Sequence, residues 1–337
     1  MRAKWKFAVP NPLLEKEAQQ FLQQWETNAV FQIKSSGTTG SPQTCSFQKQ
    51  QLLTSATASI AAFGLNQNTR ALLCLPMSSV GAKMLMARAL VADFELFFQE
   101  PSSRPLQNLG QSIDFIAMVP TQLQQSLLHD LEQLKRIPKI LIGGGELTPA
   151  LKAACREAEL HVWQSYGMTE TLSHVALQQI SPTEAAHYSA LPGIQFSTKN
   201  DCLVIHYPQM QTQAFYTKDL VALHSATSFT WLGRADNAIN SGGFKIIPEL
   251  LEQKLAGHFQ NPFFTAGVTD EKWGQVVGII FEGEVIKDYL HFDGLGLSSA
   301  EIPKKYACIQ VFKRTSTHKI QRKEILQSLS NADWKPL

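Results

Sequence analysis

Strand-length apolar runs alternate with helix-length segments over the first half of the chain, and this alternation constrains the fold more than any other feature. Residues 71–76 and 113–119 are apolar runs of strand length, and residues 80–92 between them have the length of a helix. We expect strands at 31–34, 71–76, 94–99, 113–119, 139–143 and 161–165, and helices at 12–26, 48–63, 80–92, 121–134 and 147–158. Because helical crossovers join parallel strands, the pattern predicts an α/β fold with a mainly parallel sheet flanked by helices.

The pattern changes twice further along the chain. After about residue 172, short apolar runs separated by turn residues predict a β-rich, antiparallel or barrel-like section. A second change comes at residues 233–236, and the remainder predicts a small α+β unit. Its expected elements are a helix at 249–256, strands at 264–268, 275–281 and 307–313, and a last helix from Ile320. With 337 residues, more than one core usually supports, we expect a large domain at 1–235 and a small one at 236–337.

Composition excludes several classes of protein. Thirty basic and 28 acidic side chains leave a net charge of +2, too little for a nucleic-acid surface. The five cysteines are an odd number without metal-finger spacing, which favours a reducing compartment over a disulfide framework. The first twenty residues become charged before any apolar run typical of a signal peptide, and no run is long enough to span a membrane. We therefore expect a cytoplasmic protein.

A segment rich in hydroxyl groups and glycine, Ser35-Ser36-Gly37-Thr38-Thr39-Gly40, directly follows the expected strand at 31–34. Its backbone N–H groups and hydroxyls can surround a phosphate. It is not a Walker A loop, which requires G-x-x-x-x-G-K-[ST]. Alone, such a segment is more often a plain connection.

Two more segments follow expected strands of the first half, and a third lies in the β-rich section. Gly143-Gly144-Gly145-Glu146 allows close approach of the backbone to a flat ligand, although it could be an ordinary turn. Tyr166-Gly167-Met168-Thr169-Glu170 ends in a carboxylate, and a lone glutamate of this kind is most often a surface residue. Tyr216-Thr217-Lys218-Asp219 offers a carboxylate that can accept hydrogen bonds from two vicinal hydroxyls.

The last two segments lie in the final third of the chain. The first runs from Gly233-Arg234-Ala235-Asp236 through Gly242-Gly243 to Glu252, and the second is Thr315-Ser316-Thr317-His318-Lys319-Ile320-Gln321-Arg322-Lys323. In order and spacing, over roughly residues 30–326, all these strings resemble the motifs of the acyl-adenylate-forming (AMP-binding) superfamily. That superfamily includes acyl-CoA synthetases, the adenylation domains of peptide synthetases, and luciferases.

The resemblance implies an AMP-forming acid–thiol ligase that uses ATP, Mg²⁺ and coenzyme A. It implies that residues 1–235 bind ATP and the acid and that residues 236–337 form a mobile lid. It assigns the nucleotide to Ser35, Ser36, Gly37, Thr38, Thr39, Gly40, Gly144, Gly145, Glu146, Tyr166, Gly167, Asp219 and Arg234. Thr169 would contact the α-phosphate, Glu170 would hold Mg²⁺, and Lys319 would be the mobile catalytic cation. Asp236 would be the hinge, and Gly242 and Gly243 would line the route of the CoA thiol.

The chain departs from the family pattern at three positions. Gln43 stands where the phosphate loop usually has lysine, and Lys218 and His318 stand where glycine is usual. These departures favour an alternative of another class, a catalytically weak nucleotide-binding relative. Retention of Glu170 and Lys319, with Asp219 and Arg234, argues against it.

Two further stretches, at residues 75–89 and at Gly167–His174, resemble compact o-succinylbenzoate–CoA ligases of menaquinone biosynthesis. Such a substrate has two carboxylates, and one must be recognised without reacting. Lys83 or Arg88 could supply the cation, and Ser78, Ser79 or His174 the hydrogen bonds. On a helix Lys83 and Arg88 lie about 140° apart, so we expect only one of them to face the acid. The alternative, that both side chains face solvent, has about equal weight.

The sequence leaves open other assignments within the superfamily. Another ligase for aryl or small acids, or an adenylating enzyme that transfers to a carrier protein, would share the same motifs. The expected partners are small molecules rather than nucleic acid or a membrane, and both a monomer and a homodimer remain open.

Overall fold

The computed structural model describes residues 4–7, 11–34, 44–315 and 320–337. The expected phosphate loop, Ser35–Gly40, and the expected catalytic Lys319 therefore lie outside the described residues, as do Gln43 and His318. The chain folds into two compact units. The first comprises Met1–Ser197, Ile205–Phe215 and His224–Phe229, and the second Thr198–Val204, Tyr216–Leu223 and Thr230–Leu337. The predicted boundary between residues 235 and 236 falls inside the second unit and stays a prediction.

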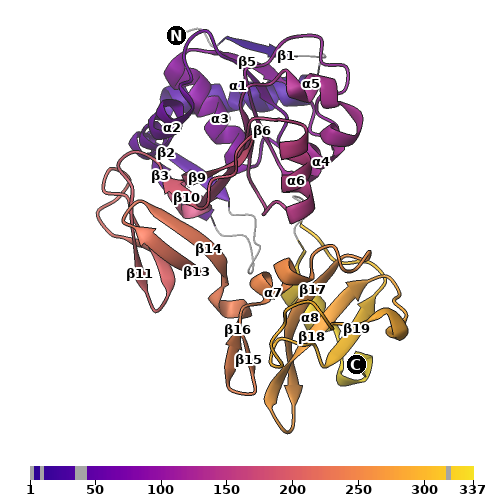
Figure 1. Ribbon diagram of the computed structural model, residues 1–337. Coiled ribbons are helices and arrows are strands. Elements are labelled where there is room, and N and C mark those ends of the chain that lie inside the picture. Colours follow the sequence, from indigo (N-terminus) through magenta and orange to yellow (C-terminus); the bar gives the residue numbers. More distant parts are fainter. Residues whose placement is uncertain (1–3, 8–10, 35–43, 316–319) are drawn as a thin grey trace. The chain divides into compact units, whose positions relative to one another are not determined.

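A run of parallel strands forms the centre of the first unit (Figure 1). In spatial order the strands are β1 (Trp5–Phe7), β5 (Glu95–Phe98), β4 (Arg70–Leu73), β6 (Phe115–Met118), β7 (Ile140–Ile142) and β8 (Val162–Met168). The helices are α1 (Pro12–Thr27), α2 (Lys49–Phe63), α3 (Val80–Ala92), α4 (Pro120–His129), α5 (Leu131–Lys135) and α6 (Pro149–Glu157). Each of these strand pairs is parallel, which confirms the predicted α/β fold.

The expected helix at 121–134 is two helices, because the chain breaks at Asp130. This residue leaves helical geometry with φ −134° and ψ 31°. Its buried carboxylate accepts hydrogen bonds from the Arg104 guanidinium at 2.9 and 3.2 Å. A buried charge requires such a partner, so the ion pair accounts for a break that helical periodicity did not predict.

The β-rich section continues the large sheet rather than forming a separate barrel. Its strands are β9 (Ser173–Ser181), β10 (Tyr188–Ala190), β11 (Gln195–Lys199), β12 (Cys202–His206), β13 (Phe215–Ser225) and β14 (Ser228–Arg234). The sheet order continues β8-β9-β10-β14-β13-β12-β11, and β9 runs antiparallel to β8. The prediction of antiparallel strands is confirmed. The strands β11 to β14 each contribute residues to both units.

A separate hairpin flanks the predicted phosphate loop. Strand β2 (Val30–Lys34) pairs antiparallel with β3 (Thr44–Gln48), with Lys34 opposite Thr44. Sequence periodicity predicted the first strand but not the second. Lys34 and Thr44, the described residues on either side of 35–43, are therefore neighbouring strand termini.

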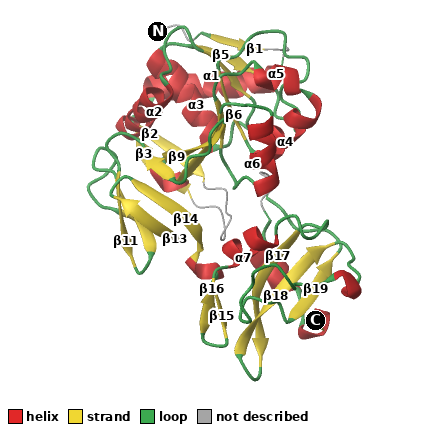
Figure 2. Ribbon diagram, in the orientation of Figure 1, coloured by secondary structure: helices red, strands yellow, loops and turns green. Residues whose placement is uncertain are grey.

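The second unit contains a small mixed sheet with helices beside it (Figure 2). Its strands are β15 (Ile239–Ser241), β16 (Phe244–Ile246), β17 (Phe263–Asp270), β18 (Gly274–Glu282), β19 (Lys305–Ile309) and β20 (Lys335–Pro336), and its helices are α7 (Pro248–Leu255) and α8 (Arg322–Ser328). The order is β16-β15-β18-β19-β20, with β17 also paired to β18. This confirms the predicted small α+β unit, although the strand expected at 307–313 ends at Ile309.

Two further findings concern the cysteines and the helices of the described residues. All five cysteines are free thiols. Within the described ranges, no helix combines the length and apolarity needed to cross a membrane.

Candidate active site

The glycine-rich and acidic segments of the first unit meet at one edge of its sheet. Strands β7 and β8 are parallel neighbours, with Ile142 opposite Gln164, so the segments after them leave the sheet at the same edge. Gly145 lies beside the start of α4, since a Cβ on it would come within 3.4 Å of Pro120. The carboxyl ends of parallel strands are the usual place for a ligand in an open α/β sheet. The structure thus brings Gly144, Gly145, Tyr166 and Gly167 to one edge.

The Tyr166–Glu170 motif begins in a strand and ends in a tight turn. Strand β8 extends through Met168, and a 3₁₀ turn at Thr169–Thr171 follows. The Tyr166 ring packs edge-on against Phe229, with ring centroids 5.0 Å apart. Thr169 is half-buried and Glu170 is exposed, so both side chains are accessible from the turn.

Gly167 is required by the close approach of strand β9. A Cβ at this position would lie 2.1 Å from the Ser173 carbonyl oxygen and 2.6 Å from the His174 Cα. A register shift between Tyr166 and Gly167 accompanies this approach. Here glycine supplies space, because the backbone of the neighbouring strand occupies the place of a side chain.

Thr171 holds the turn, a role that sequence reasoning missed. Its buried hydroxyl accepts from the Met168 N–H at 3.1 Å and lies within hydrogen-bond distance of the Met168 and Ser173 carbonyls. The threonine thus bridges the strand end before Glu170 and the strand start after it. Hydroxyl-to-backbone bonds of this kind are typical of turn residues, and that is the signal that could have identified it.

The Gly143–Glu146 turn follows β7. Gly144 has φ +80°, a left-handed conformation that favours glycine. The Ser165 hydroxyl donates to the Ile142 carbonyl at 2.9 Å and ties the turn to β8. Glu146 is exposed. Burial raises the pKa of Tyr188 above its usual value, the charge of Glu146 adds to this rise, and a hydrogen bond with Gln164 opposes it.

Arg88 is the most unusual charged residue of the first unit. It is only 1% exposed, although it lies on α3 among apolar side chains. Its Nη2 donates to the Ser173 hydroxyl at 2.9 Å, while its Nε has no acceptor among the described residues. Burial lowers the pKa of Arg88 to about 10, so the guanidinium stays protonated at neutral pH. The ion pairs found within the described ranges do not include this residue.

His174 completes a buried polar cluster with Arg88 and Ser173. Its Nδ1 lies 3.1 Å from the Ser173 hydroxyl, and its buried Nε2 has no partner among the described side chains and backbone. Burial, with a contribution from the Arg88 charge, lowers the pKa of His174 well below its usual value, so the ring is neutral. If the Ser173 hydroxyl accepts from Arg88 and donates to Nδ1, the ring proton is on Nε2. The cluster then offers two buried N–H donors, the Arg88 Nε and the His174 Nε2.

The other predicted acid-pocket residues lie at the start of α3. The Ser79 hydroxyl caps the helix by accepting from the Ala82 N–H at 3.1 Å, and Ser78 is exposed. Lys83 is half-buried, and burial together with the Lys34 charge lowers its pKa. Of the two cations weighed from the sequence, Arg88 is thus the buried one.

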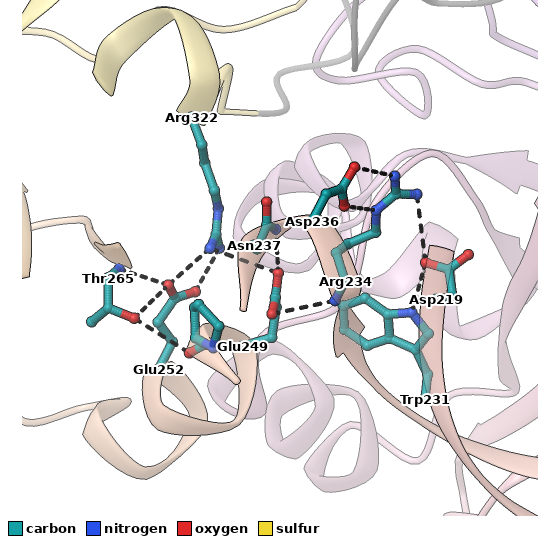
Figure 3. Close-up of polar contacts among 10 residues, drawn as sticks. Asp219, Trp231, Arg234, Asp236, Asn237, Glu249, Glu252, Thr265 and Arg322 are labelled. Atoms are coloured by element: carbon teal, nitrogen blue, oxygen red, sulfur yellow. Dashed lines mark hydrogen bonds and ion pairs between the residues drawn. The ribbon is translucent and has the colours of Figure 1, made fainter. Parts of the chain in front are cut away.

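Predicted residues of the second unit form a network of polar contacts (Figure 3). Asp219 accepts a hydrogen bond from the Trp231 Nε1 at 3.2 Å, and its carboxylate lies 3.7 Å from the Arg234 guanidinium. Arg234 binds both carboxylate oxygens of Asp236, with Nε–Oδ1 at 3.0 Å and Nη2–Oδ2 at 3.1 Å. Burial alone would raise the pKa of Asp236. The hydrogen bonds and charge of Arg234, together with the charge of Lys218, have the larger effect, so the pKa is lowered.

Gly242 and Gly243 form the two-residue turn between β15 and β16. Both have positive φ, +56° and +87°, as a tight hairpin of this length requires. The indole of Trp273 lies over Gly242, where a Cβ would come within 3.1 Å of the ring. Gly243 is exposed, and a Cβ on it would meet nothing within 4 Å, so at this position the turn presents bare backbone.

The donors present fit Mg²⁺ bound together with ATP. Among the described residues there is no cluster of three or more histidine, cysteine, aspartate or glutamate side chains that could hold a metal alone. Mg²⁺ in ATP-dependent enzymes is instead bound by one or two carboxylates with the phosphate oxygens of the substrate. The exposed carboxylate of Glu170 satisfies that requirement.

Comparison with known proteins identifies the family. The family model for AMP-binding enzymes matches residues 5–201. An acyl-CoA synthetase (AMP-forming)/AMP-acid ligase II-like protein from Dyadobacter fermentans is 35% identical, with a TM-score of 0.64 over 95% of this chain and 96% of that one. The 2-succinylbenzoate–CoA ligase of Bacillus cereus is 26% identical over 341 residues, covering 88% of this chain and 69% of its own length.

A solved structure of lower identity supports the fold. The o-succinylbenzoate coenzyme A synthetase of Bacillus subtilis, in complex with ATP and magnesium ion, has a TM-score of 0.76 at 22% identity, covering 88% of this chain and 69% of that one. The match to the family model and the likeness to the Dyadobacter protein confirm the predicted superfamily, and the chain belongs to the AMP-binding enzyme family.

Proposed function

We propose that the protein is an ATP-dependent acid–CoA ligase that acts on 2-succinylbenzoate through an acyl-AMP intermediate. The proposal rests above all on the buried Arg88 guanidinium, which has no carboxylate partner among the described residues. The Bacillus cereus relative, whose name specifies 2-succinylbenzoate, supports the choice of acid.

A buried, unpaired charge is costly, so a protein that retains one usually has a use for it. Arg88 and His174 offer donors only, provided that the His174 proton is on Nε2 as inferred from Ser173. A carboxylate is an acceptor only, and a guanidinium is the side chain best suited to bind it in two places. The cluster therefore suits the carboxylate of a dicarboxylic acid that is recognised but does not react.

We propose that the nucleotide is bound as the family resemblance implies. Gly144, Gly145, Glu146 and Tyr166 would border the adenine, with Gly167 and the loop at 35–40 near the phosphates. Thr169 would donate to the α-phosphate, and Glu170 would hold Mg²⁺, which neutralises part of the phosphate charge. Asp219 would accept from the ribose hydroxyls, and Arg234 would contact ribose or phosphate.

The proposed reaction has two half-reactions, formation of acyl-AMP and transfer of the acyl group to CoA. Lys319 would supply the mobile positive charge for the first. The acid carboxylate attacks the α-phosphorus of ATP, its oxygen forms the new P–O bond, and pyrophosphate leaves. The residues from 236 onward would then turn about Asp236, and the CoA sulfur would approach along Gly242 and Gly243. The thiolate attacks the acyl carbon, the bond to AMP breaks, and the thioester forms.

We infer a cytoplasmic location from three observations. The cysteines are free thiols, ATP is a substrate of the proposed reaction, and so is CoA.

Pyrophosphate release with a panel of acids tests the proposal. With ATP, Mg²⁺ and CoA, 2-succinylbenzoate should give the highest kcat/KM, ahead of benzoate and of a fatty acid. A preference for a simple monocarboxylate would reject 2-succinylbenzoate but keep the ligase. Acyl transfer to a carrier-protein thiol in place of CoA would identify the carrier-dependent alternative. Absence of pyrophosphate release with every acid would favour the catalytically weak nucleotide-binding relative.

A further inference from the structure

A tryptophan on β14 donates a hydrogen bond to a carboxylate of the predicted nucleotide site on β13. The Trp231 Nε1 lies 3.2 Å from the Asp219 Oδ1 (Figure 3). Strands β13 and β14 are neighbours in the large sheet, and both residues belong to the second unit. An indole N–H can only donate and an ionised carboxylate can only accept, so the bond has a single sense. The half-buried Trp231 ring therefore holds one oxygen of a carboxylate whose side chain is 14% exposed.

A second donor approaches the same oxygen of Asp219. The Arg234 Nη1 lies 3.7 Å from Oδ1, while its Nε and Nη2 bind Asp236 at 3.0 and 3.1 Å. In Figure 3 the other carboxylate oxygen of Asp219 points away from Trp231 and Arg234. Two donors that meet at one oxygen restrain rotation of the carboxylate about its Cβ–Cγ bond, and this sets the direction in which the second oxygen points.

The backbone of Asp219 is held as well. The Thr217 hydroxyl accepts from the Asp219 N–H at 3.1 Å and donates to the Leu203 carbonyl on β12 at 2.9 Å. Different partners thus fix the two parts of Asp219, Thr217 its main chain and Trp231 its side chain. A carboxylate held in this way is oriented before a ligand arrives, so ligand binding does not need to order it.

We propose that Trp231 is a positioning residue for Asp219, and that through this carboxylate it sets the preference of the protein for a ribose with both vicinal hydroxyls. The inference rests on the proposed function, in which Asp219 accepts from the ribose hydroxyls. A carboxylate accepts from two vicinal hydroxyls only when its oxygens face them, so its rotation matters as much as its position. The family resemblance assigned no role to Trp231, which lies three residues before Arg234 in the sequence.

The positioning role predicts a selective loss of nucleotide affinity. Trp231→Phe keeps an aromatic ring but removes the N–H, and it should raise the Kd for ATP about five- to twentyfold. The Kd for 2′,3′-dideoxy-ATP, which offers Asp219 no hydroxyl, should stay within about twofold of wild type. Trp231→His should recover part of the affinity for ATP, because the imidazole Nε2–H occupies the same place in its five-membered ring as the indole Nε1–H.

Titration calorimetry of the whole chain with ATP and with 2′,3′-dideoxy-ATP, in the presence of Mg²⁺ and without acid, tests the inference. The measurement requires no turnover, and its stoichiometry gives the fraction of protein that binds, so a variant that folds poorly still yields both constants. Trp334→Phe is the matched control, since this half-buried indole packs against the hydrophobic cluster around Phe264 and should change neither Kd. In an Asp219→Ala background, Trp231→Phe should weaken ATP binding no further.

The outcomes separate this inference from the proposed function. Equal weakening of both nucleotides by Trp231→Phe, unchanged affinity for ATP, or a further loss in the Asp219→Ala background would overturn the positioning role and leave the ligase assignment intact. Equal affinity of the wild-type protein for ATP and 2′,3′-dideoxy-ATP would overturn both the positioning role and the ribose contact of Asp219. A wild-type protein that binds neither nucleotide would contradict the proposed function itself.

Discussion

Arg88 on α3 and Ser173 on β9 are joined by a hydrogen bond of 2.9 Å that anchors a buried guanidinium next to a neutral histidine. The serine hydroxyl also lies 3.1 Å from the His174 Nδ1, so the three side chains form one cluster. Because the hydroxyl carries no charge, it does not neutralise the guanidinium, and we propose that a carboxylate of the acid does so.

Arg88→Gln should weaken recognition of the dicarboxylic acid selectively. Loss of a charge-assisted hydrogen bond to the carboxylate should raise the KM for 2-succinylbenzoate roughly ten- to a hundredfold and leave the KM for ATP unchanged. Steady-state pyrophosphate release measures both constants. Arg156→Gln, which removes a surface ion pair with Glu184, is the control. An unchanged KM for 2-succinylbenzoate in folded Arg88→Gln would contradict the assigned role.

His174 should make folding stability depend on pH below neutrality. Its pKa is lowered in the folded protein by burial and by the Arg88 charge, whereas in the unfolded chain it returns to about 6.5. As pH falls below about 6.5, the unfolded state binds a proton that the folded state does not, so stability falls by at most about 1.4 kcal/mol per pH unit. Urea unfolding between pH 8 and 5 should show a shallower fall for His174→Gln.

The exposed His129 supplies the control for this measurement. His129→Gln should keep the wild-type pH dependence of the free energy of unfolding. Identical pH dependence in His174→Gln and wild type would show that burial of His174 does not make the free energy of unfolding depend on pH.

Gly167→Ala should destabilise the protein because the new methyl group meets the backbone of β9. A Cβ placed 2.1 Å from the Ser173 carbonyl oxygen requires the strands to separate. Overpacking of this kind typically costs about 1–3 kcal/mol, which urea unfolding resolves. Gly110→Ala is the matched control, since a Cβ there has no neighbour within 4 Å. Equal stability of the two variants would refute the steric argument.

The sequence predicted the fold and the chemical class more completely than it predicted the contacts within the site. The strand–helix alternation and the order of the motifs are visible in local sequence patterns. The parallel sheet confirms the predicted fold class, and the family match confirms the predicted superfamily. The Arg88–Ser173 bond joins residues 85 positions apart, and the Arg322–Glu252 pair joins residues 70 apart. Such pairs depend on how helices and strands pack, which one sequence does not reveal.

The break between α4 and α5 has the same cause. Helical periodicity continues through residues 121–134, but the partner of Asp130 is Arg104, 26 positions earlier. Short strands were missed for a related reason. Strand β10 has three residues and β3 five, and each is defined by its neighbour more than by its own pattern.

Lys319→Ala should abolish adenylation of the free acid and spare the second half-reaction. The lysine charge is proposed to stabilise the transfer at the α-phosphorus, whereas attack of CoA on acyl-AMP does not require it. Acyl-AMP formation and its reaction with CoA are measured separately, with circular dichroism to verify folding. Comparable loss of both half-reactions in a folded variant would count against the assigned role.

The central claim is that the acid is activated as acyl-AMP before CoA takes part, and mass spectrometry of a reaction without CoA tests it most directly. Wild-type protein with ATP, Mg²⁺ and 2-succinylbenzoate should yield pyrophosphate and enzyme-bound acyl-AMP, and later addition of CoA should convert this to AMP and the thioester. Release of ADP and phosphate, or no consumption of ATP until CoA is present, would contradict the account.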